Sequence, residues 1–238
     1  MFKLIAVGDQ KIKLNFNADS VPIYTKPFSE QDKIQQEIIQ SYQKISYKKS
    51  PLIVYPPKAR RSIRGEIAYD HIDPIVHQNE VIPNLFIGDF SSFKAAVKEN
   101  PYKIDLAIRV NHQLFDFKPL TNIKIMELGF DVPDDNSEQS WNNLSAKFGV
   151  MFLAIDNALA QNKHVLISCT MGRSRSSTVV MAYLMYRYHV TFKQAFSFLF
   201  QKRLINPRDN FVAGLKAYEK RLKDYLLFGI RFFRSTPN

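Results

Sequence analysis

The chain has 238 residues, of which 45% are hydrophobic and 23% charged, with 8 glycines, 12 prolines and a formal net charge of +11. This composition is typical of a folded globular protein and excludes the collagen-like and low-complexity classes. The single cysteine excludes an intramolecular disulfide framework, so we expect a reducing compartment, the cytoplasm or the nucleus. No apolar run reaches the roughly 18 residues of a transmembrane helix, and no such segment is expected.

Residues 1–75 are expected to form an N-terminal extension of unknown role. Two short strands are predicted within residues 1–16, on either side of Gly8. Ser29 followed by Asp32 resembles a capping box, and an apolar face then continues to about residue 46, which predicts a helix.

The proline-led, basic segment 55–65 is interpreted as a linker. Within it, Arg60, Arg61 and Ile63 are similar to a kinase-docking motif, in which basic residues precede an apolar one. A kinase is therefore a candidate partner. The alternative is a solvated linker, because short basic runs are commonly no more than that.

Beyond this segment, apolar runs of strand length alternate with segments of helical spacing. Strands are expected over Val81–Ile87, Ile104–Val110, Ile123–Leu128 and His164–Ser168, and helices over Ser91–Glu99, Trp141–Gln161, 174–189, 191–202 and 208–226. An acidic loop is expected over Asp131–Ser140. The alternation predicts an α/β fold with helices on both faces of a central sheet, and ligands of such sheets bind beyond the carboxyl ends of the strands.

The last third of the chain is strongly basic. Residues 163–238 contain fourteen basic and three acidic side chains, which accounts for the whole net charge. A field of one sign attracts anions, so phosphorylated proteins, anionic lipid headgroups and nucleic acid are candidate partners, and a solvated basic face is the alternative. The apolar and basic segment 226–234 is interpreted as packing on the extension rather than as an interfacial membrane helix.

The most informative segment follows the strand at His164–Ser168. Cys169, the only cysteine, stands at the carboxyl end of this strand, and a helix is expected to start near Ser174. The first N–H groups of a helix lack intrahelical partners and the helix dipole is positive there, so the loop should bind anions and favour a thiolate. The alternative is an inert, buried cysteine.

Arg175 stands six positions after Cys169. A loop of this length can form a cradle whose N–H groups converge on a tetrahedral dianion, and Gly172 lets the backbone approach it closely. Arg175 can hold two phosphate oxygens with its planar guanidinium. A thiolate beneath the phosphorus would attack in line and form a cysteinyl-phosphate that water then hydrolyses, and this chemistry needs neither a metal nor a cofactor.

The segment from Cys169 to Ser176 resembles the signature of cysteine-dependent protein phosphatases, specifically of the dual-specificity branch, which reads His-Cys-x-x-Gly-x-Ser-Arg-Ser. The resemblance covers about residues 78–225 and is clearest in the opening strand at 81–88, the helix before the loop at 143–160, the helix body at 182–185 and the turn at 203–211. The helix before the loop is similar to that of the small atypical members. The resemblance implies the mixed-sheet α/β fold of cysteine-based phosphatases, with a catalytic domain over 76–228 and a C-terminal tail over 229–238.

By matching positions, the resemblance also implies roles for the loop residues. Cys169 would be the nucleophile, Arg175 would bind phosphate and stabilise the transition state, and Ser176 would assist expulsion of the thiolate in the second step. The phosphate-binding residues would be Thr170, Met171, Gly172, Arg173 and Ser174. A hydrogen bond at the start of the helix is a second, compatible role for Ser176.

Cleavage of a phosphate ester leaves an alkoxide or phenoxide, which needs a proton from a general acid. In the family this acid is an aspartate on a loop upstream of the cysteine, and Asp131, Asp134 and Asp135 lie in that loop here. Asp134 falls on the family position and is the predicted acid, with Asp135 as the alternative. The ordinary role of a carboxylate in such a loop is simple solvation.

Three residues depart from the family pattern. Ser168 replaces the usual histidine before the nucleophile; it can donate a hydrogen bond but carries no charge, which predicts slower or more alkaline turnover. Arg173 adds a second cation at the rim, as in some relatives that act on phospholipids, including a mitochondrial phosphatidylglycerophosphate phosphatase. Arg173 could instead pair with an acidic residue such as Asp134. Arg208 stands where the family often has asparagine.

We therefore expect a phosphoprotein phosphatase that hydrolyses phosphotyrosine, with phosphoserine and phosphothreonine as further substrates. The alternatives are a phosphoinositide or phospholipid phosphatase and a phosphate-binding pseudophosphatase. Phosphorylated protein is the expected partner, a kinase and anionic lipid are further candidates, and nucleic acid is not expected.

Overall fold

The computed structural model describes residues 2–7, 10–15, 28–47, 77–110, 121–127 and 132–234. The predicted kinase-docking motif and Asp131 lie outside these residues, as does the end of the C-terminal tail from residue 235. The division of the chain at residue 75 stays a prediction.

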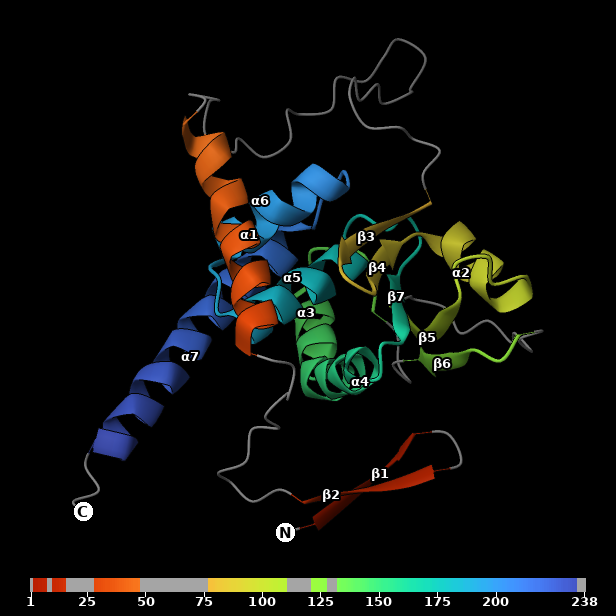
Figure 1. Cartoon of the computed structure of the whole chain (residues 1–238), viewed down its shortest axis with the longest axis horizontal. Coiled ribbons are helices and arrows are strands. Elements are labelled where there is room, and N and C mark those ends of the chain that lie inside the picture. Colours follow the sequence, from red (N-terminus) through yellow and green to blue (C-terminus); the bar gives the residue numbers. More distant parts are fainter. Residues whose placement is uncertain are drawn as a thin grey trace.

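A five-stranded mixed sheet forms the centre of the molecule, as predicted (Figure 1). Its strands are β3 (Gln78–Ile82), β4 (Leu85–Gly88), β5 (Ile104–Arg109), β6 (Lys124–Glu127) and β7 (His164–Ser168), in the order β3-β4-β7-β5-β6. β3 is antiparallel to β4, and the other neighbouring pairs are parallel. β7 therefore lies in the middle of the sheet, and the residues that follow it begin at the carboxyl edge, between the ends of β4 and β5.

Both faces of the sheet are covered by helices. α2 (Phe90–Lys98) covers one face, where a small apolar cluster includes Phe93 and Leu166. The other face carries the larger core, into which Val165 and Ile167 of the same strand β7 project. Successive strand residues point to opposite faces, so a strand with consecutive buried apolar residues, as β7 has from Val165 to Ile167, lies in the middle of the layers.

The helices of the larger face are α3 (Glu138–Ser145), α4 (Phe148–Ala160), α5 (Arg175–Tyr188), α6 (Phe192–Lys202) and α7 (Asp209–Arg234). α7 continues beyond the predicted end at residue 226, through part of the segment interpreted as a tail. Gly229 does not end it, since a glycine inside a helix costs only about 1 kcal/mol relative to alanine. None of the helices in the described part of the chain is long and apolar enough to cross a membrane.

The single strand predicted over Val81–Ile87 is wrong, because this segment contains a hairpin. Pro83 and Asn84 form the turn between β3 and β4, and Asn84 has a φ of 67°. The backbone N–H of Asn84 also donates to Glu80 Oε1 at 2.9 Å. Asparagine adopts the left-handed conformation more readily than most residues, and this makes the tight turn accessible here.

The single helix predicted over Trp141–Gln161 is also wrong. It is divided between α3 and α4, and α3 begins inside the predicted acidic loop, where the Ser137 side chain caps it by accepting from Ser140 N at 3.2 Å. The break was hidden because the buried residues Leu144 and Phe148 keep a helical spacing across it.

In the N-terminal extension, β1 (Phe2–Val7) and β2 (Gln10–Asn15) form the predicted pair of strands. α1 (Phe28–Tyr47) begins before Ser29, so Ser29 does not occupy the predicted capping position. α1 packs on α6 and α5: Ile38 is fully buried in the larger core, and Gln35 Nε2 donates to the Tyr188 carbonyl at 2.8 Å.

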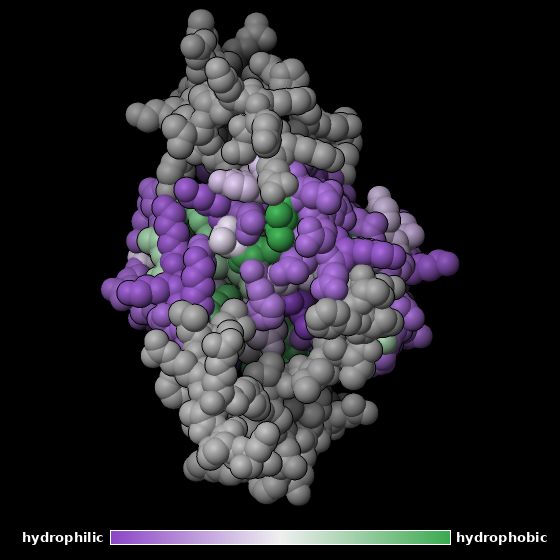
Figure 2. Space-filling model, turned by 60° about the vertical axis from the view of Figure 1, so that its left-hand side comes forward, coloured by the Kyte–Doolittle hydropathy of each residue, from purple (hydrophilic) through white to green (hydrophobic). Residues whose placement is uncertain are grey.

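The described surface shown in Figure 2 is mostly hydrophilic, with a small hydrophobic area near its middle. The large hydrophobic residues that are exposed in the described part of the chain are Tyr102 and Met171. The amphipathic helices thus bury their apolar faces, and one of the two exceptions, Met171, belongs to the predicted phosphate-binding loop.

Candidate active site

Residues 169–174, here called the signature loop, join the end of β7 to the start of α5. Cys169 is 2% exposed and borders the larger core, but its Sγ lies 3.3 Å from Ser176 Oγ in the first turn of α5. The sulfur is therefore next to a hydroxyl that can donate a hydrogen bond to it.

Each carbonyl from Thr170 to Ser174 accepts a hydrogen bond. Phe90 N donates to the Thr170 carbonyl at 3.1 Å, and Asn206 N donates to the Arg173 carbonyl at 2.9 Å. Arg203 donates from Nη2 to the Met171 carbonyl at 3.3 Å and from Nε to the Gly172 carbonyl at 2.8 Å. Thr178 N donates to the Ser174 carbonyl at 2.9 Å. These donors come from the start of α2, the segment after α6 and the body of α5. By contrast, the amides of Thr170, Met171, Gly172 and Ser174 donate to none of the described residues. A backbone nest of this kind binds anions.

Gly172 is required by its conformation and by its neighbours. Its φ is +67°, a region that favours glycine. A Cβ at this position would lie 2.6 Å from the Gly88 carbonyl oxygen and 2.6 Å from Arg203 Nη2. The loop can pass this closely over the end of β4 only with glycine.

Arg175 is buried under the loop, with 4% of its surface exposed. Its Nη1 donates to the Val132 carbonyl at 3.0 Å, and its Nη2 donates to Thr170 Oγ1 at 2.9 Å. Its Nε is buried without a hydrogen-bond partner among the described residues. An unpaired buried donor is costly, so this nitrogen is well suited to a phosphate oxygen.

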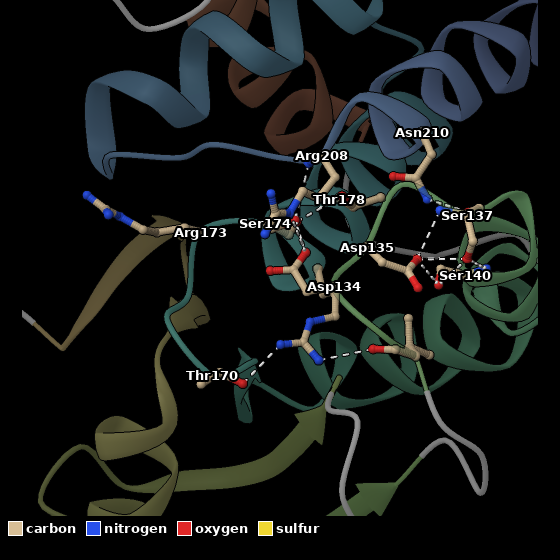
Figure 3. A network of polar contacts seen from close by, with 12 residues as sticks. Asp134, Asp135, Ser137, Ser140, Thr170, Arg173, Ser174, Thr178, Arg208 and Asn210 are labelled. Atoms are coloured by element: carbon tan, nitrogen blue, oxygen red, sulfur yellow. Dashed lines mark hydrogen bonds and ion pairs between the residues drawn. The ribbon is translucent and has the colours of Figure 1, made fainter. Parts of the chain in front are cut away.

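The two neighbouring aspartates have different partners (Figure 3). Asp134 Oδ1 accepts from Ser174 Oγ of the signature loop at 2.6 Å and lies 3.8 Å from Arg208 Nε, with 33% of the side chain exposed. Asp135 instead accepts from the hydroxyls of Ser140 at 2.6 Å and Ser137 at 2.7 Å.

The hydrogen bonds from Ser140, and then those from Ser137, hold the pKa of Asp135 below its ordinary value. An acid that must carry a proton near neutral pH is poorly served by such a site. Of the predicted candidates that are described, the structure places Asp134 beside the loop and gives Asp135 a structural position at the start of α3.

Arg173 does not approach the predicted general acid. Figure 3 shows its side chain directed away from Asp134, which is paired with Arg208 instead. Arg208 also donates its backbone N–H to Ser174 Oγ at 3.3 Å. Arg208, where the family often has asparagine, therefore contacts both the loop and the predicted acid.

Ser168, which replaces the family histidine, can donate a hydrogen bond. Its hydroxyl is buried and has no partner among the described residues. Sequence reasoning also missed Arg203, whose side chain contacts the signature loop from the end of α6. Its only signal in the sequence was its place at the start of the turn at 203–211, which belongs to the family resemblance. In the described part of the chain, no group of three or more histidines, cysteines or acidic residues is placed to hold a metal ion.

The comparisons with known proteins agree with this geometry. A family model described as the catalytic domain of dual specificity phosphatases matches residues 85–221. This match contains β4, the acidic loop predicted over Asp131–Ser140, the signature loop and the first half of α7.

Two curated relatives and one solved structure illustrate the likeness. A probable rhodanese domain-containing dual specificity protein phosphatase of Dictyostelium discoideum is 46% identical over 81 residues, which are 34% of this chain and 17% of the relative. Dual specificity protein phosphatase 13B of Mus musculus is 30% identical over 175 residues, which are 71% of this chain and 86% of the relative. The crystal structure of human DUSP28 superposes with a TM-score of 0.53 at 25% identity, covering 62% of this chain and 96% of that one. The chain thus spans less than a fifth of the Dictyostelium relative.

Proposed function

Because the chain belongs to the dual specificity phosphatase family, we propose that it hydrolyses phosphotyrosine, phosphoserine and phosphothreonine in phosphoproteins through a cysteinyl-phosphate intermediate. The observation that supports this most directly is the position of Cys169 at the base of a loop whose carbonyls from Thr170 to Ser174 accept hydrogen bonds from outside the loop. The buried, unpaired Nε of Arg175 adds a donor for the same anion.

In the first step, the thiolate of Cys169 attacks phosphorus and the bond from phosphorus to the ester oxygen breaks. Asp134 gives its proton to that oxygen, so the alcohol or phenol leaves neutral. Both contacts of Asp134 use Oδ1, and a proton on Oδ2 is compatible with them. The amides of the signature loop and Arg175 stabilise the charge that builds up on the phosphoryl oxygens.

In the second step, a water molecule attacks the phosphorus of the cysteinyl-phosphate. Asp134 takes a proton from this water, the sulfur–phosphorus bond breaks, and inorganic phosphate leaves. Ser176 Oγ, 3.3 Å from Sγ, donates a hydrogen bond to the departing thiolate and lowers the cost of its charge.

A lipid substrate is the second candidate, and Arg173 is the residue that favours it. Its side chain adds a cation at the rim of the loop and is directed away from the acid (Figure 3). A second cation close to the phosphate-binding loop would favour a substrate with a second anionic group.

The test compares the wild type with Cys169→Ser on an aryl phosphate, on phosphotyrosine, phosphoserine and phosphothreonine peptides, and on vesicles containing phosphoinositides. We expect release of phosphate from the aryl substrate and the peptides by the wild type and none by Cys169→Ser. Faster release from the vesicles than from any peptide would favour the lipid substrate. A wild type that binds inorganic phosphate but hydrolyses nothing at any pH would contradict hydrolysis and leave a pseudophosphatase.

A further inference from the structure

Arg203 is a buried arginine outside the phosphate-binding loop. It directly follows α6, is 8% exposed, and donates one hydrogen bond from each of its three guanidinium nitrogens. Nε donates to the Gly172 carbonyl at 2.8 Å, Nη2 to the Met171 carbonyl at 3.3 Å, and Nη1 to Asn79 Oδ1 of β3 at 2.8 Å. One side chain thus joins the edge of the sheet to the signature loop.

Burial of this charge is unfavourable by itself. Desolvation lowers the pKa of Arg203, although the nearby Asp89 and Cys169 act in the opposite direction. A buried guanidinium is tolerated where its N–H groups are satisfied, as three of them are here by carbonyl oxygens. Its position is therefore fixed by the acceptors around it.

The contacts with Met171 and Gly172 have a consequence on the other side of the loop. In a trans peptide the carbonyl and the following N–H point in opposite directions. A donor that holds the carbonyls of Met171 and Gly172 on the outside therefore turns the amides of Gly172 and Arg173 toward the inside. The left-handed φ of Gly172 belongs to the same arrangement.

We propose that Arg203 is a positioning residue of the phosphate site: it binds no phosphate itself but holds the peptides that follow Met171 and Gly172 with their N–H groups directed at the anion. The proposal rests on the proposed function of the loop as a phosphate site. It makes Asn79 a second positioning residue, because Asn79 fixes the end of the guanidinium that does not touch the loop.

The experiment uses Arg203→Gln and Arg203→Lys, with Arg221→Gln, an exposed arginine of α7, as the matched control. Binding is followed without turnover, from the rise of the thermal unfolding midpoint with inorganic phosphate. A ligand of the folded state stabilises it by RT ln(1 + [L]/Kd), so the phosphate concentration needed for a given rise reports the affinity. KM and kcat for an aryl phosphate are measured on the same proteins.

We expect both Arg203 variants to need at least about tenfold more inorganic phosphate than the wild type for the same rise of the unfolding midpoint. KM for the aryl phosphate should increase by a matching factor. Lysine keeps the charge, but its ammonium cannot reproduce the planar fork that reaches both carbonyls, so it should not restore the affinity. Arg221→Gln should match the wild type. An Arg203→Lys protein that unfolds cooperatively and binds phosphate with wild-type affinity and KM would overturn the proposal.

If neither Arg203 variant folds, phosphate binding by Asn79→Ala tests the proposal instead. It should weaken phosphate binding in the same direction by a smaller factor, and unchanged binding would overturn the proposal. A wild type that binds phosphate without hydrolysing any substrate would contradict the proposed function but not the role of Arg203, provided that the Arg203 variants lose the binding. A wild type that does neither would overturn both.

Discussion

The signature loop and the acidic segment, residues 132–137, meet at the hydrogen bond between Ser174 and Asp134, but they are held in different ways. The loop is fixed through its main chain, by donors from α2, α5 and the segment after α6. Asp134, by contrast, is held by the side chains of Ser174 and Arg208. We infer that phosphate binding depends on a rigid backbone, and that proton transfer depends on a carboxylate that can adjust.

This difference predicts that changes in the loop, or in Arg175 directly after it, impair both binding and chemistry. The largest expected effect is that of Arg175→Lys, since Arg175 contacts both regions through Thr170 and Val132. We expect kcat/KM for an aryl phosphate to fall about 1,000-fold, with weaker inhibition by inorganic phosphate. Arg187→Lys, in the last turn of the same helix, is the control and should leave the rate unchanged. Equal rates in both variants would remove Arg175 from the site.

Changes in the acidic segment should impair chemistry alone. Asp134→Asn should lower kcat for a phosphotyrosine peptide about 100-fold and leave inhibition by inorganic phosphate unchanged. Asp135→Asn, its neighbour, should keep kcat within about twofold, because Asp135 faces Ser137 and Ser140 instead of the loop. The reverse order of the two effects would show that the acid had been assigned to the wrong residue.

Ser176 extends the comparison of the loop with the acidic segment. It lies next to the loop, in the first turn of α5, but acts on the second step, the hydrolysis of the cysteinyl-phosphate. Ser176→Ala should lower kcat about tenfold and produce a burst of alcohol release, since the thiolate leaves without its hydrogen bond. Rapid-quench measurement of the burst on an aryl phosphate gives the result. Ser177→Ala, whose hydroxyl donates to the Arg173 and Ser174 carbonyls, should show no such burst. A Ser176→Ala variant with wild-type kcat and no burst would contradict the assigned role.

The smallest expected effect concerns Asp135 and stability. Hydrogen bonds lower the pKa of Asp135, so its stabilising contribution is present above the unfolded value of 3.8 and is lost as the pH falls through the folded value. Ser140→Ala removes the largest of these hydrogen bonds. Its unfolding midpoint should lie below that of the wild type at neutral pH, and the gap should narrow as the pH falls below 3.8. A gap independent of pH would contradict this account.

The signature loop could be predicted from the sequence because its chemistry is local. Cys169, Gly172 and Arg175 lie within one short segment, and their spacing together with the apolar strand before it and the helix after it predicts an anion site. The central sheet was likewise predictable from apolar runs of strand length. The hairpin at Pro83 and Asn84 was missed, since apolar residues stand on both sides of the turn.

The rest of the site depends on contacts between residues far apart in the chain. Asp134 and Asp135 are the same residue type in adjacent positions, and only the three-dimensional arrangement places one beside Ser174 and the other beside Ser140. Arg203 has no local pattern that connects it with Gly172. Residues that support a site from another element carry no periodicity or spacing that a sequence could reveal.

The central claim is that the sulfur of Cys169 accepts the phosphoryl group, and trapping of this intermediate tests it most directly. Ser176→Ala would be mixed with an aryl phosphate, quenched in acid, digested and analysed by mass spectrometry. The account predicts a phosphoryl adduct on the peptide that contains Cys169, and none after the same treatment of Cys169→Ser. Hydrolysis without any adduct, or an adduct that persists in Cys169→Ser, would contradict it.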